Sequence, residues 1–190
     1  EKRHRAVCWY WFAGYDFSSR GAHRGYDWFK ALEEPQTKED KIAIVTSNKV
    51  HTEYHRKRML LVDTLIEKIP DHIVVYGRGF KTIDDKADAL LPYKFNLAVE
   101  NGEGPHVWTE KLTGPWLCWS FPFYAGCSNV ADYFPLDSFE MINLDDPVVE
   151  AERMVNEMEN GRWEAALPAI SSARETVLEE ENIMTLMANL

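Results

Sequence analysis

The stretch that decides the fold is YKFNLAVENGEGPHVWTEKLTGPWLCWSFPFYAGCSNVADYFPLD, residues 93–137. Its first apolar run predicts a buried strand that ends at Glu100 and Asn101, and its second predicts a strand that ends at Gly126. Between them lie a glycine-rich turn and a charged helix start at residues 109–111. Loops and helix N-termini at the carboxyl ends of parallel strands form the ligand sites of open α/β sheets. The stretch therefore predicts a nucleotide site at such an edge.

On both sides of this stretch, short apolar runs alternate with segments whose apolar residues recur at helical spacing. The predicted strands are 42–46, 73–76, 95–99, 120–124 and 139–144. The predicted helices are 52–69, one after residue 108, 148–160 and 163–188, the last with Pro168 as a candidate break. A polar loop is expected at 84–86, and a short helix or turn at 26–32 and 129–134. Strands that alternate with such helices indicate βαβ units with right-handed crossovers. The predicted fold class is α/β, a Rossmann-like parallel sheet flanked by helices.

The composition of the chain excludes several classes of partner and site. The 190 residues carry a net charge of −10, and 45% of them are hydrophobic, which is enough for a full core. A net acidic chain is a poor partner for nucleic acid or anionic membranes, so we expect no nucleic-acid binding. No apolar run approaches the roughly 18 residues of a membrane span. The cysteines Cys8, Cys118 and Cys127 lack metal-ligand spacing, which predicts reduced thiols packed as small hydrophobes.

The first 40 residues differ from the remainder of the chain. An aromatic cluster at 8–12 and a segment rich in Gly, Ser and Arg lead to the linker-like sequence Glu33-Glu34-Pro35. We expect residues 1–40 to be an interdomain segment or the tail of a preceding domain, and residues 41–190 to form the folded domain. The chain starts without Met or a signal peptide, so we expect a fragment or a processed product.

The segment 101–111 offers the groups that a nucleoside diphosphate needs. These are backbone N–H groups at a helix start, a positive side chain, and a carboxylate or amide for ribose and base. Its glycines allow a tight turn. Thr109 can cap the helix, Glu110 lies in the first turn where the helix dipole favours a carboxylate, and Lys111 adds a positive charge. An ordinary solvated helix start has the same three residues, so this motif alone fits both interpretations.

A second positive group lies on the predicted helix 52–69. Arg56 and Lys57 fit a solvated face. Arg58 lies one turn before Val62, near the edge of the buried stripe. Its stem can therefore be buried while its guanidinium reaches over the sheet edge, where a fork matches two phosphate oxygens.

Other candidate motifs are less specific. Gly77-Arg78-Gly79 follows a strand and fits either a ligand-binding turn or a plain tight turn, and neither GxGxxG nor a P-loop is present. The histidines are scattered without an HExxH motif, so no metal site is predicted. The acidic pairs at 84–85 and 145–146 fit loops or helix caps better than a metal or acid–base pair.

Several blocks, in the same order along the chain, resemble the α-1,3-fucosyltransferases and their bacterial relatives. The blocks are Ser47-Asn48-Lys49, Thr52-Glu53, His55-Arg56, Arg58, Tyr76-Gly77-Arg78-Gly79-Phe80, Ile83-Asp84-Asp85-Lys86, Tyr93-Lys94, Glu100-Asn101, Trp108-Thr109-Glu110-Lys111-Leu112, Phe121-Pro122-Phe123-Tyr124, Gly126, Asn129 and Tyr133-Phe134-Pro135. The resemblance spans approximately residues 40–185.

This resemblance implies the C-terminal, donor-binding half of a GT-B glycosyltransferase. Such an enzyme transfers fucose from GDP-fucose to a glycan hydroxyl with inversion and requires no metal or other cofactor. Lys111 and Arg58 would neutralise the diphosphate, whose charge grows as the glycosidic bond breaks. Glu110 would hold ribose or fucose hydroxyls, and Asn101 would contact the nucleotide. The other donor-binding residues that the resemblance implies are Glu100, Ser47, Asn48, Gly77, Arg78, Thr109 and Trp108.

The resemblance also implies partners outside this chain. The glycan acceptor and the general base would belong to an N-terminal domain that the chain lacks, so the chain alone should be inactive. Animal members have C-terminal cysteine pairs that are absent here, which favours the bacterial type and a cytoplasmic location; a eukaryotic member would lie in the Golgi lumen.

Two positions depart from the family pattern. Val107 replaces a Tyr that touches the nucleotide, and Gly114-Pro115 interrupts a helix, which should kink it or delay its start. Two alternatives therefore remain open: a non-catalytic structural or protein-binding subunit, and a transferase that uses another GDP-sugar.

Overall fold

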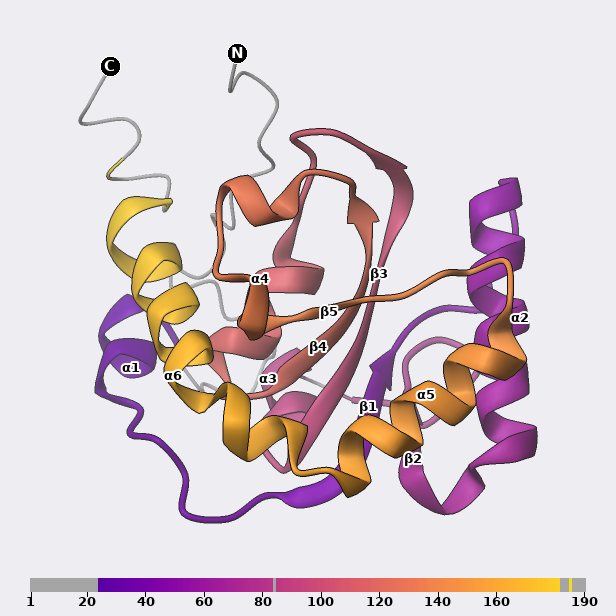
Figure 1. Cartoon of the computed structure of the whole chain (residues 1–190), viewed down its shortest axis with the longest axis horizontal. Coiled ribbons are helices and arrows are strands. Elements are labelled where there is room, and N and C mark those ends of the chain that lie inside the picture. The colour runs from indigo at the N-terminus through magenta and orange to yellow at the C-terminus, as the bar shows by residue number, and fades with distance from the viewer. Residues whose placement is uncertain (1–23, 84, 182–184, 186–190) are drawn as a thin grey trace.

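A five-stranded parallel sheet forms the centre of the molecule (Figure 1). The computed structural model describes residues 24–83, 85–181 and 185. In sheet order, the strands are β2 (Ile73–Tyr76), β1 (Glu39–Val45), β3 (Tyr93–Gly104), β4 (Phe121–Cys127) and β5 (Glu140–Met141). The predicted α/β class and parallel sheet are confirmed.

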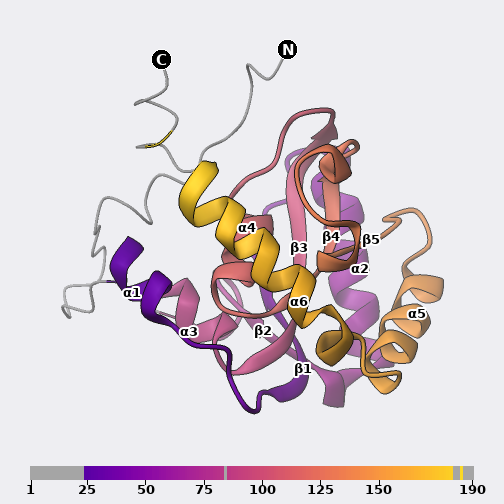
Figure 2. The same cartoon turned by 60° about the vertical axis from the view of Figure 1, so that its left-hand side comes forward.

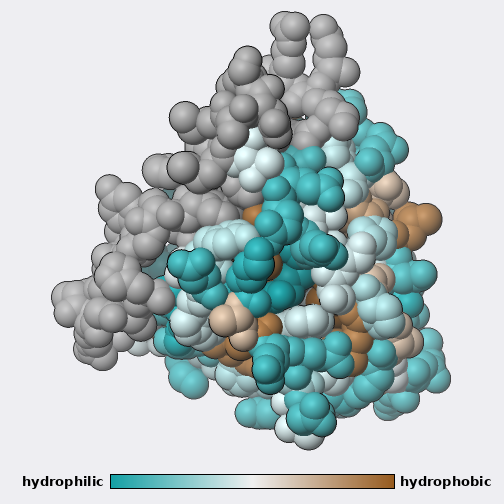
Figure 3. Space-filling model, turned by 90° about the vertical axis from the view of Figure 1, so that its left-hand side faces the viewer, coloured by the Kyte–Doolittle hydropathy of each residue, from teal (hydrophilic) through white to brown (hydrophobic). Residues whose placement is uncertain are grey.

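Helices cover both faces of this sheet. They are α1 (Tyr26–Ala31), α2 (Glu53–Lys68), α3 (Lys86–Leu90), α4 (Glu110–Leu117), α5 (Pro147–Glu159) and α6 (Arg162–Glu175), which continues as a π-helical turn over Thr176–Glu180. The helices α2 and α5 pack together on one face, and α3, α4 and α6 lie on the other, with α1 at its edge (Figures 1 and 2). The outer surface on the α6 side is mostly hydrophilic where it is described, with small scattered apolar areas (Figure 3).

The core is densest around β3 and β4, as their continuous apolar runs predict. Every residue of β4 is buried, and on β3 the run 95–100 is buried. Phe95 stacks on Phe123 with ring centroids 5.5 Å apart, and Phe121 contacts Phe95 edge-on at 6.1 Å. Such aromatic pairs add to the stabilisation from buried area. The two strands that carry the site at their carboxyl ends are therefore firmly held.

Two predicted strand ends are wrong. The glycine-rich turn expected at 102–104 is instead a continuation of β3, because Gly104 still pairs with Cys127 after a shift in register. The chain turns at the next two residues, Pro105 and His106, where His106 adopts a left-handed φ of 63°. The strand expected at 139–144 is reduced to Glu140–Met141, since β5 is an edge strand that pairs with β4 alone.

The predicted helices need three corrections. Lys86, which was expected in a polar loop, is instead the first residue of the short helix α3. The helix α6 is not broken at Pro168; the carbonyl that loses its partner belongs to the exposed Glu164 and can bond to water. The helix expected to reach residue 188 ends at Glu180, and most of the following residues lie outside the described part of the chain.

Two further predictions concern single features. Cys118 and Cys127 are buried free thiols, as predicted, whereas Cys8 lies outside the described residues. Thr52 caps α2 by accepting a hydrogen bond from the backbone N–H of His55, as its position before the helix indicated. Within the described ranges, no helix is long and apolar enough to cross a membrane.

Candidate functional site

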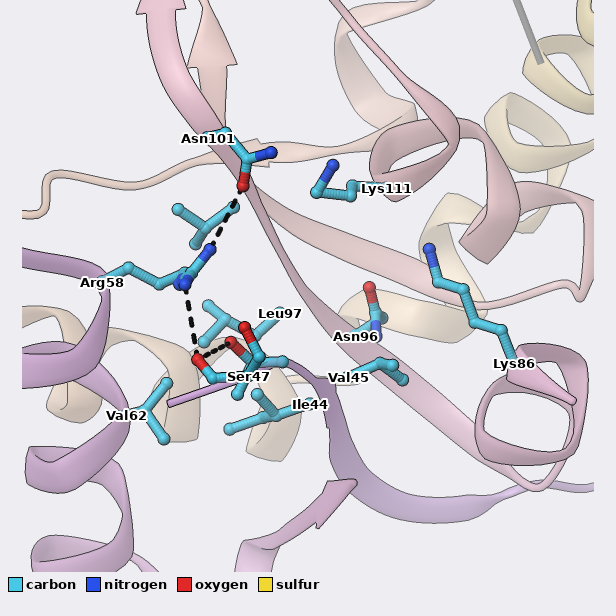
Figure 4. A pocket seen from close by; sticks show the side chains of 12 residues that line it. Ile44, Val45, Ser47, Arg58, Val62, Lys86, Asn96, Leu97, Asn101 and Lys111 are labelled. Atoms are coloured by element: carbon cyan, nitrogen blue, oxygen red, sulfur yellow. Dashed lines mark hydrogen bonds between the residues drawn. The ribbon is translucent and has the colours of Figure 1, made fainter. Parts of the chain in front are cut away.

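A cavity of about 250 Å³ opens where β1 and β3 end (Figure 4). The strand order reverses at this point: β2 lies on one side of β1, and β3, β4 and β5 lie on the other. Such a switch point leaves a crevice at the carboxyl ends of the strands, which is where open α/β sheets bind their ligands. The apolar floor comes from Ile44, Val62, Leu97 and Val99. The cavity therefore lies at the edge that the sequence predicted.

Three cationic side chains from three different helices line this cavity. Arg58 comes from α2, Lys86 from α3 and Lys111 from α4 (Figure 4). None of the described residues that line it is acidic. A small cavity with three positive charges and an apolar floor is suited to an anion with several oxygens, such as a diphosphate.

Arg58 is the most unusual of these cations. Its side chain is only 7% exposed, yet no ion pair to it is found among the described residues. Its guanidinium makes long hydrogen bonds of 3.4 Å to Asn101 Oδ1 and to the carbonyl oxygens of Ser47 and Lys49, and its Nε has no partner. Burial lowers the pKa of Arg58 because nothing nearby offsets the loss of hydration. A buried charge without a counter-charge is costly, so Arg58 is set up to receive an anion.

Lys111 is positioned through the start of α4. Thr109 caps this helix, and its side-chain oxygen accepts from the backbone N–H of Lys111 at 3.3 Å. Glu100, 3% exposed, holds the cap in place by accepting from the Thr109 backbone N–H at 2.8 Å and from its hydroxyl at 2.7 Å. The Nζ of Lys111 lies 3.5 Å from Glu100 and 3.4 Å from Glu110. The carboxylates therefore fix the lysine beside the positive end of the helix dipole.

Lys86 is the site residue that the sequence did not predict. It is the first residue of α3, whose N-cap is Asp85, and its Nζ donates to the Glu110 carbonyl oxygen at 3.1 Å. The matching block Ile83-Asp84-Asp85-Lys86 contained this residue, but no helical pattern indicated where it would point. Its place after β2, at the same sheet edge as Arg58, was the one usable signal.

The structure brings part of the predicted donor-binding set together and leaves part outside the cavity. Ser47 and Asn101 line it. Gly77 and Arg78 form a tight turn in the neighbouring loop, where Gly77 has a φ of +115°, and Asn48 is exposed beside them. The remaining predicted residues, Glu100, Thr109 and Glu110, surround the start of α4 behind Lys111.

Trp108 does not line the cavity. It is fully buried and packs against Phe134 with ring centroids 5.2 Å apart. Its indole therefore anchors the loop before α4 to the core.

No cluster of three or more His, Cys, Asp or Glu side chains suited to a metal occurs within the described residues.

The fold is an open α/β sheet with a crevice lined by cations at its switch point. A family model described as "Glycosyltransferase family 10 (fucosyltransferase) C-term" matches residues 35–159. The chain belongs to this family.

Solved structures support the same fold. A structure described as "alpha1,3-Fucosyltransferase with GDP-fucose" aligns with a TM-score of 0.54 and 22% identity, over 77% of this chain and 49% of the other. One described as "alpha1,3-Fucosyltransferase with GDP" gives 0.53 and 22%, and a third fucosyltransferase structure gives 0.51 and 19%. The chain spans about half the length of these solved proteins. The expected correspondence to the C-terminal domain of a GT-B glycosyltransferase is confirmed at the level of the fold.

Proposed function

We propose that this domain binds GDP-fucose as the donor for fucosyl transfer, with the diphosphate between Arg58, Lys86 and Lys111. The observation that carries the proposal is Arg58, a buried guanidinium that has no ion-pair partner among the described residues and lines the cavity. Membership of the fucosyltransferase family makes a GDP-sugar the first candidate for the anion that these cations would bind. Solved structures of similar fold are described as containing GDP-fucose and GDP.

The chemistry follows from where charge develops. As the bond between the fucose anomeric carbon and the β-phosphate oxygen breaks, negative charge grows on that oxygen. Cations already held in place stabilise this charge more in the transition state than in the ground state. Arg58 is confined mainly by its burial, with long hydrogen bonds to Asn101 and Ser47, and Lys111 is held by the cap of α4. In this proposal the three side chains carry out the charge neutralisation, and no metal or other cofactor is required.

The remaining parts of the reaction lie outside this chain in our proposal. Inverting transfer needs a base that takes the proton of the acceptor hydroxyl on the face opposite the leaving group. We assign that base and the glycan-binding surface to an N-terminal domain, so the described domain by itself should bind the donor and transfer nothing. We also propose the bacterial, cytoplasmic type.

Calorimetric titration with GDP, UDP and GDP-fucose tests the donor site. We expect GDP and GDP-fucose to bind the chain and UDP to bind more weakly, and we expect Lys111→Ala and Lys86→Met to weaken GDP binding at least tenfold. Lys41→Met removes a partly exposed lysine near the other end of β1 and should leave GDP affinity unchanged. Absence of any nucleotide binding at millimolar concentration would refute the proposal and favour a structural subunit. GDP binding without preference for the fucose conjugate would indicate another GDP-sugar.

A further inference from the structure

Lys38 binds the far ends of the two helices that carry Lys86 and Lys111 into the cavity. It immediately precedes β1, at the end of the sheet opposite to the cavity. Its Nζ donates to the carbonyl oxygen of Leu90, the last residue of α3, at 3.1 Å, and to that of Cys118, the C-cap of α4, at 2.6 Å. One side chain therefore joins the C-terminal ends of both helices.

A cation is suited to these two helix ends. The last four carbonyl groups of a helix have no partners within the helix, and its dipole is negative at that end. A third acceptor, the hydroxyl oxygen of the buried Ser120, lies 2.7 Å from the Lys38 Nζ. The three acceptors match the three N–H donors of an ammonium group. Burial lowers the pKa of Lys38 to about 7, so the ammonium that makes all three bonds is the main form below that pH.

The surroundings of Lys38 are tied to the sheet. The backbone N–H of Glu39, the next residue, donates to the Pro92 carbonyl oxygen at 2.8 Å, just after α3. The Ser120 hydroxyl, just before β4, donates to the Leu90 carbonyl oxygen at 2.9 Å. Lys38 therefore attaches the end of α3 to the frame of the sheet as well as to α4.

The position of α3 depends on this attachment more than that of α4 does. The start of α4 is fixed by Glu100, which holds the Thr109 cap through two hydrogen bonds. The start of α3 is held by Asp85, which caps the helix and pairs with Arg24 at 2.8 Å in a partly exposed ion pair. Such pairs contribute little to stability. What ties α3 to α4 at the C-terminal end is Lys38.

The opposite end of α3 reaches the cavity. Lys86 is the first residue of this helix, and its Nζ donates to the carbonyl oxygen of Glu110 in α4 at 3.1 Å. Lys86 and Lys111 line the cavity together (Figure 4). At about 1.5 Å per residue, α3 is only about 7.5 Å long, so a shift of its last residue also moves its first. The position of α3 relative to α4 therefore sets the distance between the two lysines.

We propose that Lys38 is a positioning residue that sets the spacing of Lys86 and Lys111 in the anion cavity. It acts from the opposite end of the sheet, through the last turn of α3, and touches no ligand. The inference rests on the proposed function, because it takes the cavity as a diphosphate site. Arg174 from α6 donates to the Leu117 carbonyl oxygen at 3.4 Å and supports the end of α4, whereas Lys38 is bonded to both helices.

Titration of the full chain with inorganic pyrophosphate and with inorganic phosphate tests the spacing. A diphosphate must contact both cavity lysines at once, whereas a single phosphate can follow either one. At pH 6, Lys38→Met should weaken pyrophosphate binding at least about fivefold and phosphate binding less than about twofold, measured by calorimetry or phosphorus NMR. General destabilisation affects both ions equally, so it would not change this preference. Equal weakening of both ions, or no change, overturns the proposal.

Lys94→Met is the matched control. Lys94 is also a partly buried lysine near the N-terminal end of its strand, but its Nζ bonds to Glu164 of α6 at 2.7 Å. Its replacement removes a buried contact at the same end of the sheet and should leave the preference for pyrophosphate unchanged. If Lys94→Met lost the preference as Lys38→Met does, the effect would be a general one and the proposal would fall.

A double-mutant cycle shows whether Lys38 acts through the spacing of the cavity lysines. Once Lys86 is replaced by methionine, no pair of lysines remains to be spaced. In the Lys86→Met background, Lys38→Met should therefore change pyrophosphate affinity less than about twofold. An effect of Lys38→Met that is undiminished in this background contradicts the proposal.

Hydrogen exchange tests the attachment of α3 without any ligand. The backbone N–H of Leu91 donates to the Ala87 carbonyl oxygen and closes the last turn of α3. In Lys38→Met this amide should exchange at least about threefold faster, while the amides of α2 keep their rates. Unchanged exchange at Leu91 overturns the proposal, whatever the result with anions.

The choice of inorganic ions separates this inference from the proposed function. If the wild type binds pyrophosphate but not GDP, the proposed function fails, and the variants above still decide the role of Lys38. If pyrophosphate does not bind the wild type at millimolar concentration, the cavity is no diphosphate site and both proposals fall.

Discussion

Replacing Arg58 by methionine should lower ligand affinity strongly while it changes stability little or raises it. Most functional residues are also packed, so their loss usually lowers both quantities. Arg58 differs because its charge is buried, its Nε is unpartnered and no acidic side chain in the described structure neutralises it. Methionine keeps much of the apolar stem that packs beside Val62 and removes only the charge.

The expected changes in stability and in GDP affinity follow from the contacts of the Arg58 guanidinium. The three hydrogen bonds of the guanidinium are all 3.4 Å long, so their loss costs little, and relief of the buried charge offsets it. We expect the free energy of unfolding without ligand to stay within about 1 kcal/mol of the wild type, or to rise. A hydrogen bond to a charged phosphate contributes about 1.5–3 kcal/mol, so GDP affinity should fall about 10- to 150-fold.

Urea denaturation without ligand and calorimetry with GDP measure the two quantities. Arg56→Met is the matched control, because Arg56 lies two residues away, is exposed and pairs with Glu53 at 2.9 Å. It removes the same charge and should change GDP affinity less than about twofold, since exposed charges are screened by salt. If Arg58→Met lost more than about 2 kcal/mol of stability and kept its GDP affinity, Arg58 would be a structural residue and the reasoning would fail.

Three further predictions concern the framework of the site. In the variant Glu100→Gln the side chain can accept only one of the two hydrogen bonds from Thr109. Urea denaturation should therefore show a free energy of unfolding about 1–3 kcal/mol lower than the wild type, and GDP should bind more weakly. A variant as stable as the wild type would contradict this prediction. Gly77→Ala adds a Cβ that would collide with the Thr46 carbonyl oxygen, at a residue whose φ is positive. The same assay should show a loss of at least about 1–3 kcal/mol in the free energy of unfolding. An unchanged urea midpoint would count against the turn at Gly77. Burial lowers the pKa of Lys38 to about 7, so between about pH 7 and pH 10 the unfolded chain binds more protons than the folded chain, and stability rises with pH. Lys38→Met should flatten that rise in free energy of unfolding, measured as the difference from the wild type across a pH series. Parallel stability profiles of the two proteins would exclude the pKa shift.

The parts of the site that the sequence predicted depend on regular patterns that extend along one helix or strand. Arg58 was found because it lies four residues before Val62 on a helix of 16 residues, where the buried stripe is easy to follow. Ser47 and Asn101 were implied by the resemblance to the fucosyltransferases, and each follows an apolar run of strand length. For Arg58, the position along the helix also fixed the direction in which the side chain points.

Lys86 was missed because α3 is too short to show a period. Its five residues are held by the Asp85 cap and by burial of Ala87, Ala89 and Leu90 under the sheet, which is tertiary information. A cavity of about 310 Å³ at the carboxyl ends of β3 and β4 was missed for a similar reason. It depends on β3 continuing past Glu103 through contacts with β4, although its glycines favour a turn.

The helix α4 shows why an interruption in sequence need not disturb a site. Pro115 is the sixth residue of α4, so the carbonyl that loses its partner is that of Lys111, while the N–H groups at the start of the helix are unaffected. What fixes that start is Glu100, and Glu100 fits there because position 126 is a glycine: an added Cβ would lie 2.8 Å from the Glu100 Cβ and closer still to its Cγ. The direction of Lys111 is therefore set by two neighbouring strands at the start of the helix. A proline near the other end can shorten the helix without turning its first residues away from the cavity.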